Sequence, residues 1–242
     1  MTMDNPQRVH ICPISYEVDR VILPLVKMRA DKAYLITKRS APERDKARRF
    51  LENIEQVLKV HDVPFKVLRC DIDDFHDCLH EIGLVIQGER SEGNAVLVNI
   101  STGGRVVSHA SAVAGMMYGA SLYYAEPEKD DREEREYTHG LRQVLPIPAF
   151  HIEPPDLVSL DCLEAIKGAG GSVHKRQLIE HFRSRGLVTA RSTKPQAVYG
   201  VVKRLCQPMI DRGWVEEVGR TRARKVQITP EGERILKGFR GA

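Results

Sequence analysis

Residues 95–126 read AVLVNISTGGRVVSHASAVAGMMYGASLYYAE, and this stretch determines the architecture of the first half of the chain. Its first six residues are valine-rich and bounded by turn formers, which is typical of a strand buried on both faces. A small polar and glycine turn follows. Residues 105–118 then predict a helix with valine, alanine, methionine and glycine on nearly every side, so we expect deep packing. Residues 120–124 predict a second short strand.

The turn between this strand and this helix has a composition that suits an anion. Gly103 and Gly104 let ligand atoms approach the main chain closely. The first amides of the helix have no partner within the helix and carry a partial positive charge. These features favour a bound phosphate. A tight strand-to-helix connection without any ligand explains the same residues, and the turn alone leaves both interpretations open.

Strand and helix alternate four times before a fifth strand, which predicts an α/β fold built on a Rossmann-like, doubly wound parallel sheet. We expect strands at 9–12, 33–37, 64–68, 95–100 and 120–124, and helices near 17–25, 43–60, 75–86 and 105–118. Residues 143–147 are expected to add an edge strand. The first strand is not followed by G-x-G-x-x-G, and the chain has no G-x-x-x-x-G-K-[ST] motif, so an ordinary dinucleotide or P-loop domain is excluded.

The expected strand order, 3-2-1-4-5, makes the first and fourth strands neighbours at the point where the order reverses. The loops that follow them, Pro13–Tyr16 and Asn99–Arg105, would then border one crevice. This convergence favours a ligand over a bare connection. The residues expected to bind it are Pro13, Ser15, Tyr16, Asn99, Ser101, Thr102, Gly103, Gly104 and Arg105.

Length and charge predict two domains with different tasks. The chain has 242 residues, and prolines near 146–155 read as a linker, which gives expected domains at 1–150 and 151–242. From Pro155 onward there are 17 Lys and Arg against 9 Asp and Glu, whereas the residues before it have 20 against 24. The basic final third is the part suited to a polyanion. Five dispersed cysteines, the lack of a secretory leader and the lack of an apolar membrane span indicate a cytoplasmic protein.

The second domain has the pattern of a winged helix-turn-helix. Asp156 and Thr229 are expected helix caps, and Thr193 to Gln196 has the spacing of a capping box. Three helices precede two strands, 214–218 and 225–229, which a basic tip at 219–224 joins. This arrangement favours DNA binding over a merely solvated hairpin. The expected DNA-binding residues are Lys194, Gln196, Tyr199 and Lys203 of the recognition helix, and Arg220, Arg222, Arg224 and Lys225 at the hairpin.

Both halves also resemble known proteins. The turn at 99–105 is similar to the signature of the CRISPR-associated Rossmann-fold (CARF) domain. The segments His10–Pro13, Glu17–Arg20 and Val98–Gly103 resemble an archaeal family of CARF and winged-helix transcriptional regulators. The resemblance implies a homodimer that binds a cyclic oligoadenylate at the two crevice loops. It also raises slow ring-nuclease activity as an alternative. Arg105 departs from the Thr-Lys of many CARF turns, which leaves room for a different nucleotide.

Two further clusters are candidate sites. His76 and His80 lie one helical turn apart beside Asp73, Asp77 and Glu81, but an exposed polar helix face explains them better than a metal does. Near the first loop, Glu17, Asp19 and Arg20 could orient a ligand or attack a ribose phosphate, although capping and pairing within the helix explain them more simply.

We therefore expect a homodimeric transcriptional regulator that binds double-stranded DNA and responds to a nucleotide ligand, with no catalytic residues, metal, cofactor or membrane contact. A cyclic-oligonucleotide ring nuclease with an accessory winged helix is the alternative, and a constitutive architectural DNA binder is a third reading. No nucleophile–base pair requires an enzyme.

Overall fold

The computed structural model describes residues 6–39, 45–130, 138–186, 195–219 and 224–239, with only the helical backbone given for 195–199 and 201–202. The chain forms two units that divide between Glu153 and Pro154. The boundary expected from the sequence lies between residues 150 and 151.

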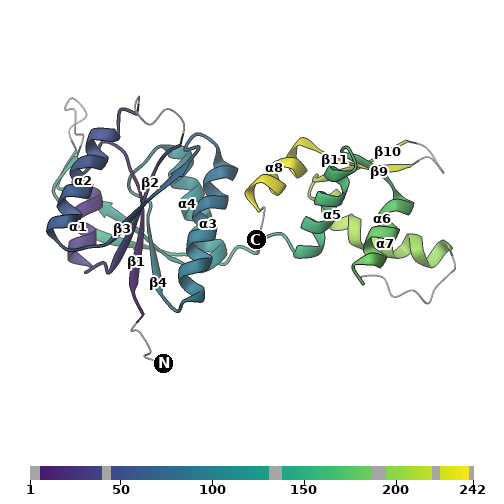
Figure 1. The fold of residues 1–242 in the computed structure, drawn as a ribbon, viewed down its shortest axis with the longest axis horizontal. Helices are drawn as coiled ribbons and strands as arrows, with labels where there is room; N and C mark the ends of the chain where they lie inside the picture. Colours follow the sequence, from purple (N-terminus) through teal and green to yellow (C-terminus); the bar gives the residue numbers. More distant parts are fainter. Residues whose placement is uncertain (1–5, 40–44, 131–137, 187–194, 220–223, 240–242) are drawn as a thin grey trace. The chain divides into compact units, whose positions relative to one another are not determined.

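Strands and helices alternate through the first unit (Figure 1). Its elements are β1 (Arg8–Pro13), α1 (Asp19–Lys27), β2 (Lys32–Lys38), α2 (Arg48–Val60), β3 (Phe65–Cys70), α3 (Phe75–Ser91), β4 (Ala95–Asn99), α4 (Arg105–Tyr118), β5 (Ser121–Glu126), β6 (Lys129–Asp130), β7 (Thr138–His139) and β8 (Gln143–Ile147).

The central sheet has the order β3-β2-β1-β4-β5-β8. All neighbours are parallel except β8, which runs antiparallel to β5 with Leu122 opposite Ile147. On β1, His10 is level with Ala33 of β2 and Leu97 of β4. The predicted doubly wound parallel sheet is therefore confirmed, with the edge strand at 143–147.

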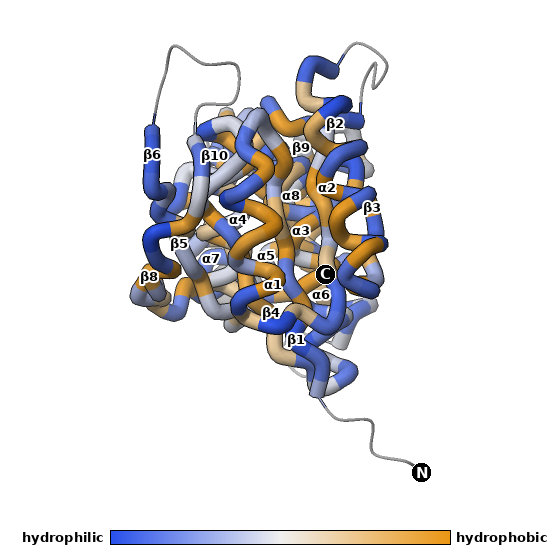
Figure 2. The backbone as a smooth tube through the Cα atoms, turned by 90° about the vertical axis from the view of Figure 1, so that its left-hand side faces the viewer, coloured by the Kyte–Doolittle hydropathy of each residue, from blue (hydrophilic) through white to orange (hydrophobic). Residues whose placement is uncertain are grey.

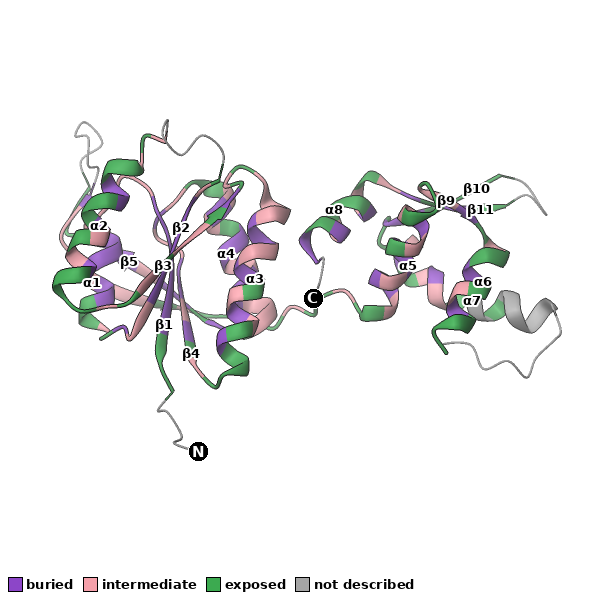
Figure 3. Ribbon diagram, in the orientation of Figure 1, coloured by how far each residue is buried: buried purple, intermediate pink, exposed green. Residues whose placement is uncertain are grey.

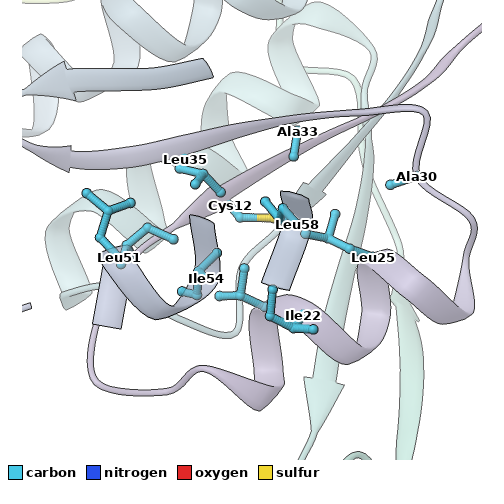
Figure 4. Close-up of a cluster of buried hydrophobic side chains, with 11 residues drawn as sticks. Cys12, Ile22, Leu25, Ala30, Ala33, Leu35, Leu51, Ile54 and Leu58 are labelled. Carbon is cyan, nitrogen blue, oxygen red and sulfur yellow. The ribbon is translucent and has the colours of Figure 1, made fainter. Parts of the chain in front are cut away.

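Helices cover both faces of this sheet, with α1 and α2 on one face and α3 and α4 on the other (Figure 1). Figure 3 shows the inner strands β1 and β2 largely buried, and β2 is enclosed along its middle five residues. The edge strands β3 and β8 are more accessible. In Figure 4, side chains from α1 and α2 pack onto Cys12 and Leu35 of the sheet. This cluster includes Ile22, Leu25, Ile54 and Leu58.

The small residues of α4 let it approach the sheet closely. A Cβ atom at Gly115 would lie 2.4 Å from Cδ2 of Leu122, so only glycine fits this contact without a shift. One face of the helix is buried, through Val107, Ala110 and Ala114, whereas His109 is exposed. The deep packing expected of α4 is thus confined to this face, whereas Arg105 and His109 are exposed.

The second unit has the winged-helix topology. Its elements are α5 (Leu157–Gly168), β9 (Ser172–His174), α6 (Lys175–Ser184), α7 (Pro195–Asp211), β10 (Val215–Val218), β11 (Lys225–Ile228) and α8 (Pro230–Gly238). The strands form an antiparallel sheet in the order β10-β11-β9. Asp156 accepts a hydrogen bond from Ser159 N and Thr229 from Gly232 N, which confirms both expected caps. The capping box at Thr193 lies outside the described residues.

Apolar residues of the second unit's helices and strands recur on their inward faces. The same alternation of hydrophobic and hydrophilic residues can be seen along α1 and α2 of the first unit in Figure 2, as in amphipathic helices generally. The core of this unit includes Leu163, Phe182, Met209 and Val226, all of them fully or almost fully buried. No helix in the described ranges has both the length and the apolar character needed to span a membrane.

Candidate functional site

The two loops expected to form a crevice are joined by a hydrogen bond. Thr102 Oγ1 donates to the carbonyl oxygen of Pro13 at 2.5 Å, and both residues are buried. Because β1 and β4 pair in parallel, with Ile11 level with Val98, their carboxyl ends lie at the same edge of the sheet. The structure thus brings the segments Pro13–Tyr16 and Asn99–Arg105 together where the strand order reverses.

The two glycines of the turn differ in what surrounds them. Gly103 has φ +85°, and a Cβ atom there would lie 2.6 Å from Cβ of Pro13 and 2.9 Å from Cγ1 of Val107. Its lack of a side chain is required by packing within the protein. Gly104 has φ −68°, is exposed, and a Cβ atom there would meet no atom within 4 Å. Gly104 is therefore the glycine that leaves the backbone open to a ligand.

Gly104 also begins α4. It caps the helix without a side-chain hydrogen bond. The first amides of a 14-residue helix have no acceptor inside the helix, and the helix dipole adds partial positive charge at this end. Arg105, in the first turn, is exposed and adds a full positive charge. This end of α4 is suited chemically to bind an anion.

The polar side chains of the β4 turn hold its shape. Asn99 is fully buried; its Nδ2 donates to the carbonyl of Arg20 and its Oδ1 accepts from Ser101 N, both at 2.9 Å. Ser101 Oγ accepts from Ala125 N at 2.5 Å. These bonds attach the turn to α1 and β5. Asn99 and Ser101 therefore position the turn rather than offer free groups to a ligand.

The loop after β1 lies beside the β4 turn, joined to it by the Thr102–Pro13 hydrogen bond. Ser15 is half-buried, and its hydroxyl donates to Glu17 Oε2 at 3.3 Å. The half-buried Tyr16 packs edge-on against Phe50 of α2, with ring centroids 5.4 Å apart. The predicted residues Ser15 and Tyr16 thus remain partly accessible, whereas Pro13 is enclosed beneath Thr102 and Gly103.

The acidic and basic residues at the start of α1 are paired within the protein. Arg20 Nη1 contacts Glu17 Oε1 at 2.7 Å, and Arg20 Nε donates to the carbonyl of Ala125 at 2.9 Å. Asp19 Oδ2 accepts from Gly140 N at 2.7 Å. Glu17 and Arg20 pair as expected, although Glu17 precedes the helix, which begins at Asp19. The bond from Arg20 to Ala125 ties α1 to the end of β5.

A buried polar group of β1 was not predicted from the sequence. His10 is fully buried, and its Nδ1 lies 3.1 Å from the hydroxyl of Tyr123 on β5. Burial lowers the pKa of His10 to about 4 and raises the pKa of Cys12, on the same strand, to about 12. Both groups are therefore neutral near pH 7. The sequence feature that could have revealed this buried group is the histidine inside the apolar run VHIC.

The carboxylates at the start of α3 and just before it belong to a salt-bridge network with β2 and the residue that follows it. Arg39 contacts Asp77 at 3.0 Å and Glu81 at 2.5 Å, and Lys38 contacts Asp73 at 3.1 Å. Within the described ranges, no group of three or more His, Cys, Asp or Glu side chains is arranged to hold a metal ion.

A cavity of about 370 Å³ lies along α2. Side chains of both charges line it, and one pair of them, Arg48 and Glu52, forms an ion pair at 2.9 Å. None of the residues expected to bind the ligand lines this cavity.

The expected DNA-binding residues of the second unit fall on α7 and the β10–β11 hairpin. Lys203 of α7 is exposed, as is Lys225 of β11, and Arg224 precedes that strand. Lys194, Arg220 and Arg222 lie outside the described residues. Gln196 and Tyr199 belong to α7, but their side chains are not described.

A groove of about 610 Å³ runs between α7 and the hairpin. Lys175, Lys203 and Arg224 line it together with Glu216 and Glu217. Glu217 contacts Lys175 at 2.5 Å and Arg224 at 3.1 Å, and the hydrogen bond from Lys175 lowers the pKa of the Glu217 carboxyl. Lys175 was not among the predicted DNA-binding residues, because it precedes the expected recognition helix.

These observations define a class of protein: a Rossmann-like α/β domain with a glycine turn at the point where the strand order reverses, joined to a winged helix. Residues 8–130 match the family described as "HFX_2341_N:-like, N-terminal", and residues 158–240 match the "DUF6293 C-terminal winged helix domain". The chain belongs to the HFX_2341_N:-like family. The predicted combination of a Rossmann-like α/β domain and a C-terminal winged helix is confirmed.

The relatives and solved structures that resemble this chain are longer than it, and each match spans only part of them. MJ1513 of Methanocaldococcus jannaschii is 29% identical over 137 residues, which span 53% of this chain and 41% of that relative. Can2 from Sulfobacillus thermosulfidooxidans, in complex with cyclic tetra-adenylate, has 9% identity and a TM-score of 0.46, covering 96% of this chain and 63% of its own. Csm6 from Enterococcus italicus, bound to cyclic hexa-2'-fluoro-hexa-dAMP, has 9% identity and a TM-score of 0.43, covering 86% and 56%. The chain thus spans less than two thirds of each of these proteins.

Proposed function

We propose that this chain is a ligand-responsive, DNA-binding transcriptional regulator whose first domain senses a nucleotide second messenger. The observation that carries the proposal is the turn fixed by the Thr102–Pro13 hydrogen bond, which presents the open backbone of Gly104 and the positive end of α4. A phosphodiester is the group that this arrangement suits best. The winged helix on the same chain supplies the response.

A cyclic oligoadenylate is the ligand we propose. The support is the resemblance of the segments His10–Pro13 and Val98–Gly103 to CARF regulators. A homodimer would place two such crevices about one symmetry axis, so that a ring with repeated phosphates contacts both. Ligand binding would then change the spacing of the two winged helices on a pair of DNA half-sites about one helical turn apart.

Turnover of the ligand is not part of the proposal. The carboxylates nearest to the crevice, Glu17 and Asp19, are engaged by Arg20 and by Gly140 N. Ser15 of the first loop donates a long hydrogen bond to Glu17 at 3.3 Å, but that carboxylate is already paired with Arg20 and is therefore a weak base for activating the hydroxyl. We therefore prefer a sensor to the ring-nuclease alternative.

One experiment separates these functions. Purified full-length protein is titrated calorimetrically with cyclic tetra-adenylate and cyclic hexa-adenylate, and the same mixtures are analysed for linear products. Binding without cleavage supports the sensor. Rapid cleavage under single-turnover conditions supports the nuclease. If neither ring binds while DNA does, the first domain has another role, such as dimerisation.

A further inference from the structure

A carboxylate that lines the groove of the winged helix contacts two of the cations there. Glu217 belongs to β10, on the same face of the strand as the buried Val215 but beyond the core. Its Oε1 contacts Lys175 Nζ, at the start of α6, at 2.5 Å. Its Oε2 contacts Arg224 Nη1, beside the hairpin tip, at 3.1 Å. Each oxygen of the carboxylate thus holds one cation, and the two cations come from different elements.

The pairing with Glu217 uses one donor of each cation. An ammonium has three donors and a guanidinium five, and one of each is directed to Glu217. The side chain of Lys175 is 17% exposed and that of Arg224 is 49% exposed. Both long side chains are held in one place, so binding an anion would cost less ordering entropy than it does for free surface cations.

A negative charge on a surface that binds DNA opposes binding by simple electrostatics. Glu217 is nonetheless placed where Lys175, Lys203 and Arg224 line one groove between α7 and the hairpin. This placement is explained if the carboxylate fixes the positions of cations that act on phosphate oxygens.

We propose that Glu217 is a positioning residue that holds Lys175 and Arg224 against the sugar–phosphate backbone of duplex DNA seated in this groove. The inference rests on the proposed DNA binding of the winged helix. It adds Lys175, which lies outside the expected recognition helix, to the residues that bind phosphates. It also assigns a supportive role to an acidic residue in a basic surface.

The test is the affinity of the full-length chain for a DNA duplex as a function of salt, measured by fluorescence anisotropy. Glu217→Gln should misalign the two cations and lower the log–log salt slope by about 0.9 for each phosphate that is no longer neutralised. This change corresponds to roughly fivefold weaker affinity per phosphate at about 0.15 M salt. Electrostatics without positioning predicts the reverse, because a negative charge has been removed.

Glu216→Gln is the matched control. Glu216 is the neighbouring residue on β10, is exposed, lines the same groove, and forms no ion pair with any described residue. This variant should bind DNA as tightly as wild type or more tightly. In a Lys175→Ala, Arg224→Ala background, Glu217→Gln should cause no further decrease of the slope, because the groups that Glu217 positions are gone.

Thermal unfolding of each variant distinguishes a loss of positioning from a folding defect. Glu217→Asp keeps the charge on a shorter side chain, so its DNA affinity and salt slope should fall between those of wild type and Glu217→Gln. Glu217→Gln that binds DNA with unchanged or higher affinity would overturn the inference while leaving DNA binding by the winged helix intact. An equal decrease of the slope in the Lys175→Ala, Arg224→Ala background would also overturn it. Wild-type protein that binds no DNA would overturn both proposals.

Discussion

Thr102 Oγ1 donates a buried hydrogen bond to the carbonyl oxygen of Pro13 at 2.5 Å, across 89 residues of sequence. This bond joins the ends of the two neighbouring strands, β1 and β4, at the place where the strand order reverses. The turn that holds Gly103 and Gly104 is thereby fixed against the first loop. The shape of the proposed nucleotide site exists before any ligand arrives.

Removing this hydroxyl should loosen the site. Thr102→Val keeps the shape of the side chain but not the donor, so we expect a decrease of about 1 kcal/mol in the free energy of unfolding and weaker nucleotide binding. Thr102→Ser, which keeps the hydroxyl, should bind more nearly as wild type does. Urea denaturation and calorimetric titration measure the two effects. Equal nucleotide affinity in all three proteins would show that the bond does not shape the site.

The two glycines of the turn should respond differently to substitution. Gly104→Val adds a side chain in open space at a φ that valine adopts, so it should cost about 1 kcal/mol of stability as a poor helix cap and should block the ligand. Gly103→Ala forces a Cβ atom against Pro13 and Val107 at a positive φ, and should cost about 1–3 kcal/mol. Circular dichroism and calorimetry separate the two. Normal nucleotide affinity in a folded Gly104→Val would remove the turn from the site.

His10 should make the stability of the first domain depend on pH. Its pKa is lowered by burial from 6.5 to about 4, so the unfolded chain binds the proton more readily than the folded chain does. The contribution of His10 to the free energy of unfolding is fully present above pH 6.5. It decreases as the pH is lowered to 4, by about 3 kcal/mol in total. Urea unfolding of wild type and His10→Asn between these pH values tests this. If the free energy of unfolding of the two proteins changes with pH in parallel, the pH dependence does not come from His10.

On the DNA side, Lys203 and Gln196 should contribute to different properties. Lys203→Ala removes an exposed cation from the groove and should weaken binding to all sequences alike, with a salt slope lower by about 0.9. Gln196→Ala should cost about 1–3 kcal/mol at one preferred base pair. Duplexes selected by the protein from a random library, with single base-pair changes, provide the measurement. If both variants retain wild-type affinity, slope and preference, α7 does not read DNA.

The architecture could be predicted from sequence because it rests on strong periodic signals. Residues 105–118 have the pattern of a helix and form α4, Arg105–Tyr118. The strands that were missed are short: β9 has 3 residues, and β6 and β7 have 2 each. Segments of this length contain no measurable period, and their pairing with distant strands decides their conformation.

The place of the candidate site was also predictable, because parallel strands and a reversal of strand order bring two particular loops together. The contacts within the site could not be predicted. Nothing in the sequence distinguishes Gly103, which packing against Pro13 requires, from Gly104, which faces open space. The Lys175–Glu217 pair joins residues 42 positions apart, and only the folded hairpin makes them neighbours.

A ligand-responsive regulator requires that a nucleotide bound in the first domain changes the affinity of the second domain for DNA. The most direct test is the equilibrium affinity of the full-length protein for a selected duplex, measured with and without saturating cyclic tetra-adenylate and, in parallel, cyclic hexa-adenylate. We expect a change of roughly 5- to 150-fold with one of the two rings, and none in Gly104→Val. The same affinity with and without either ring in the wild-type protein would contradict the proposed function.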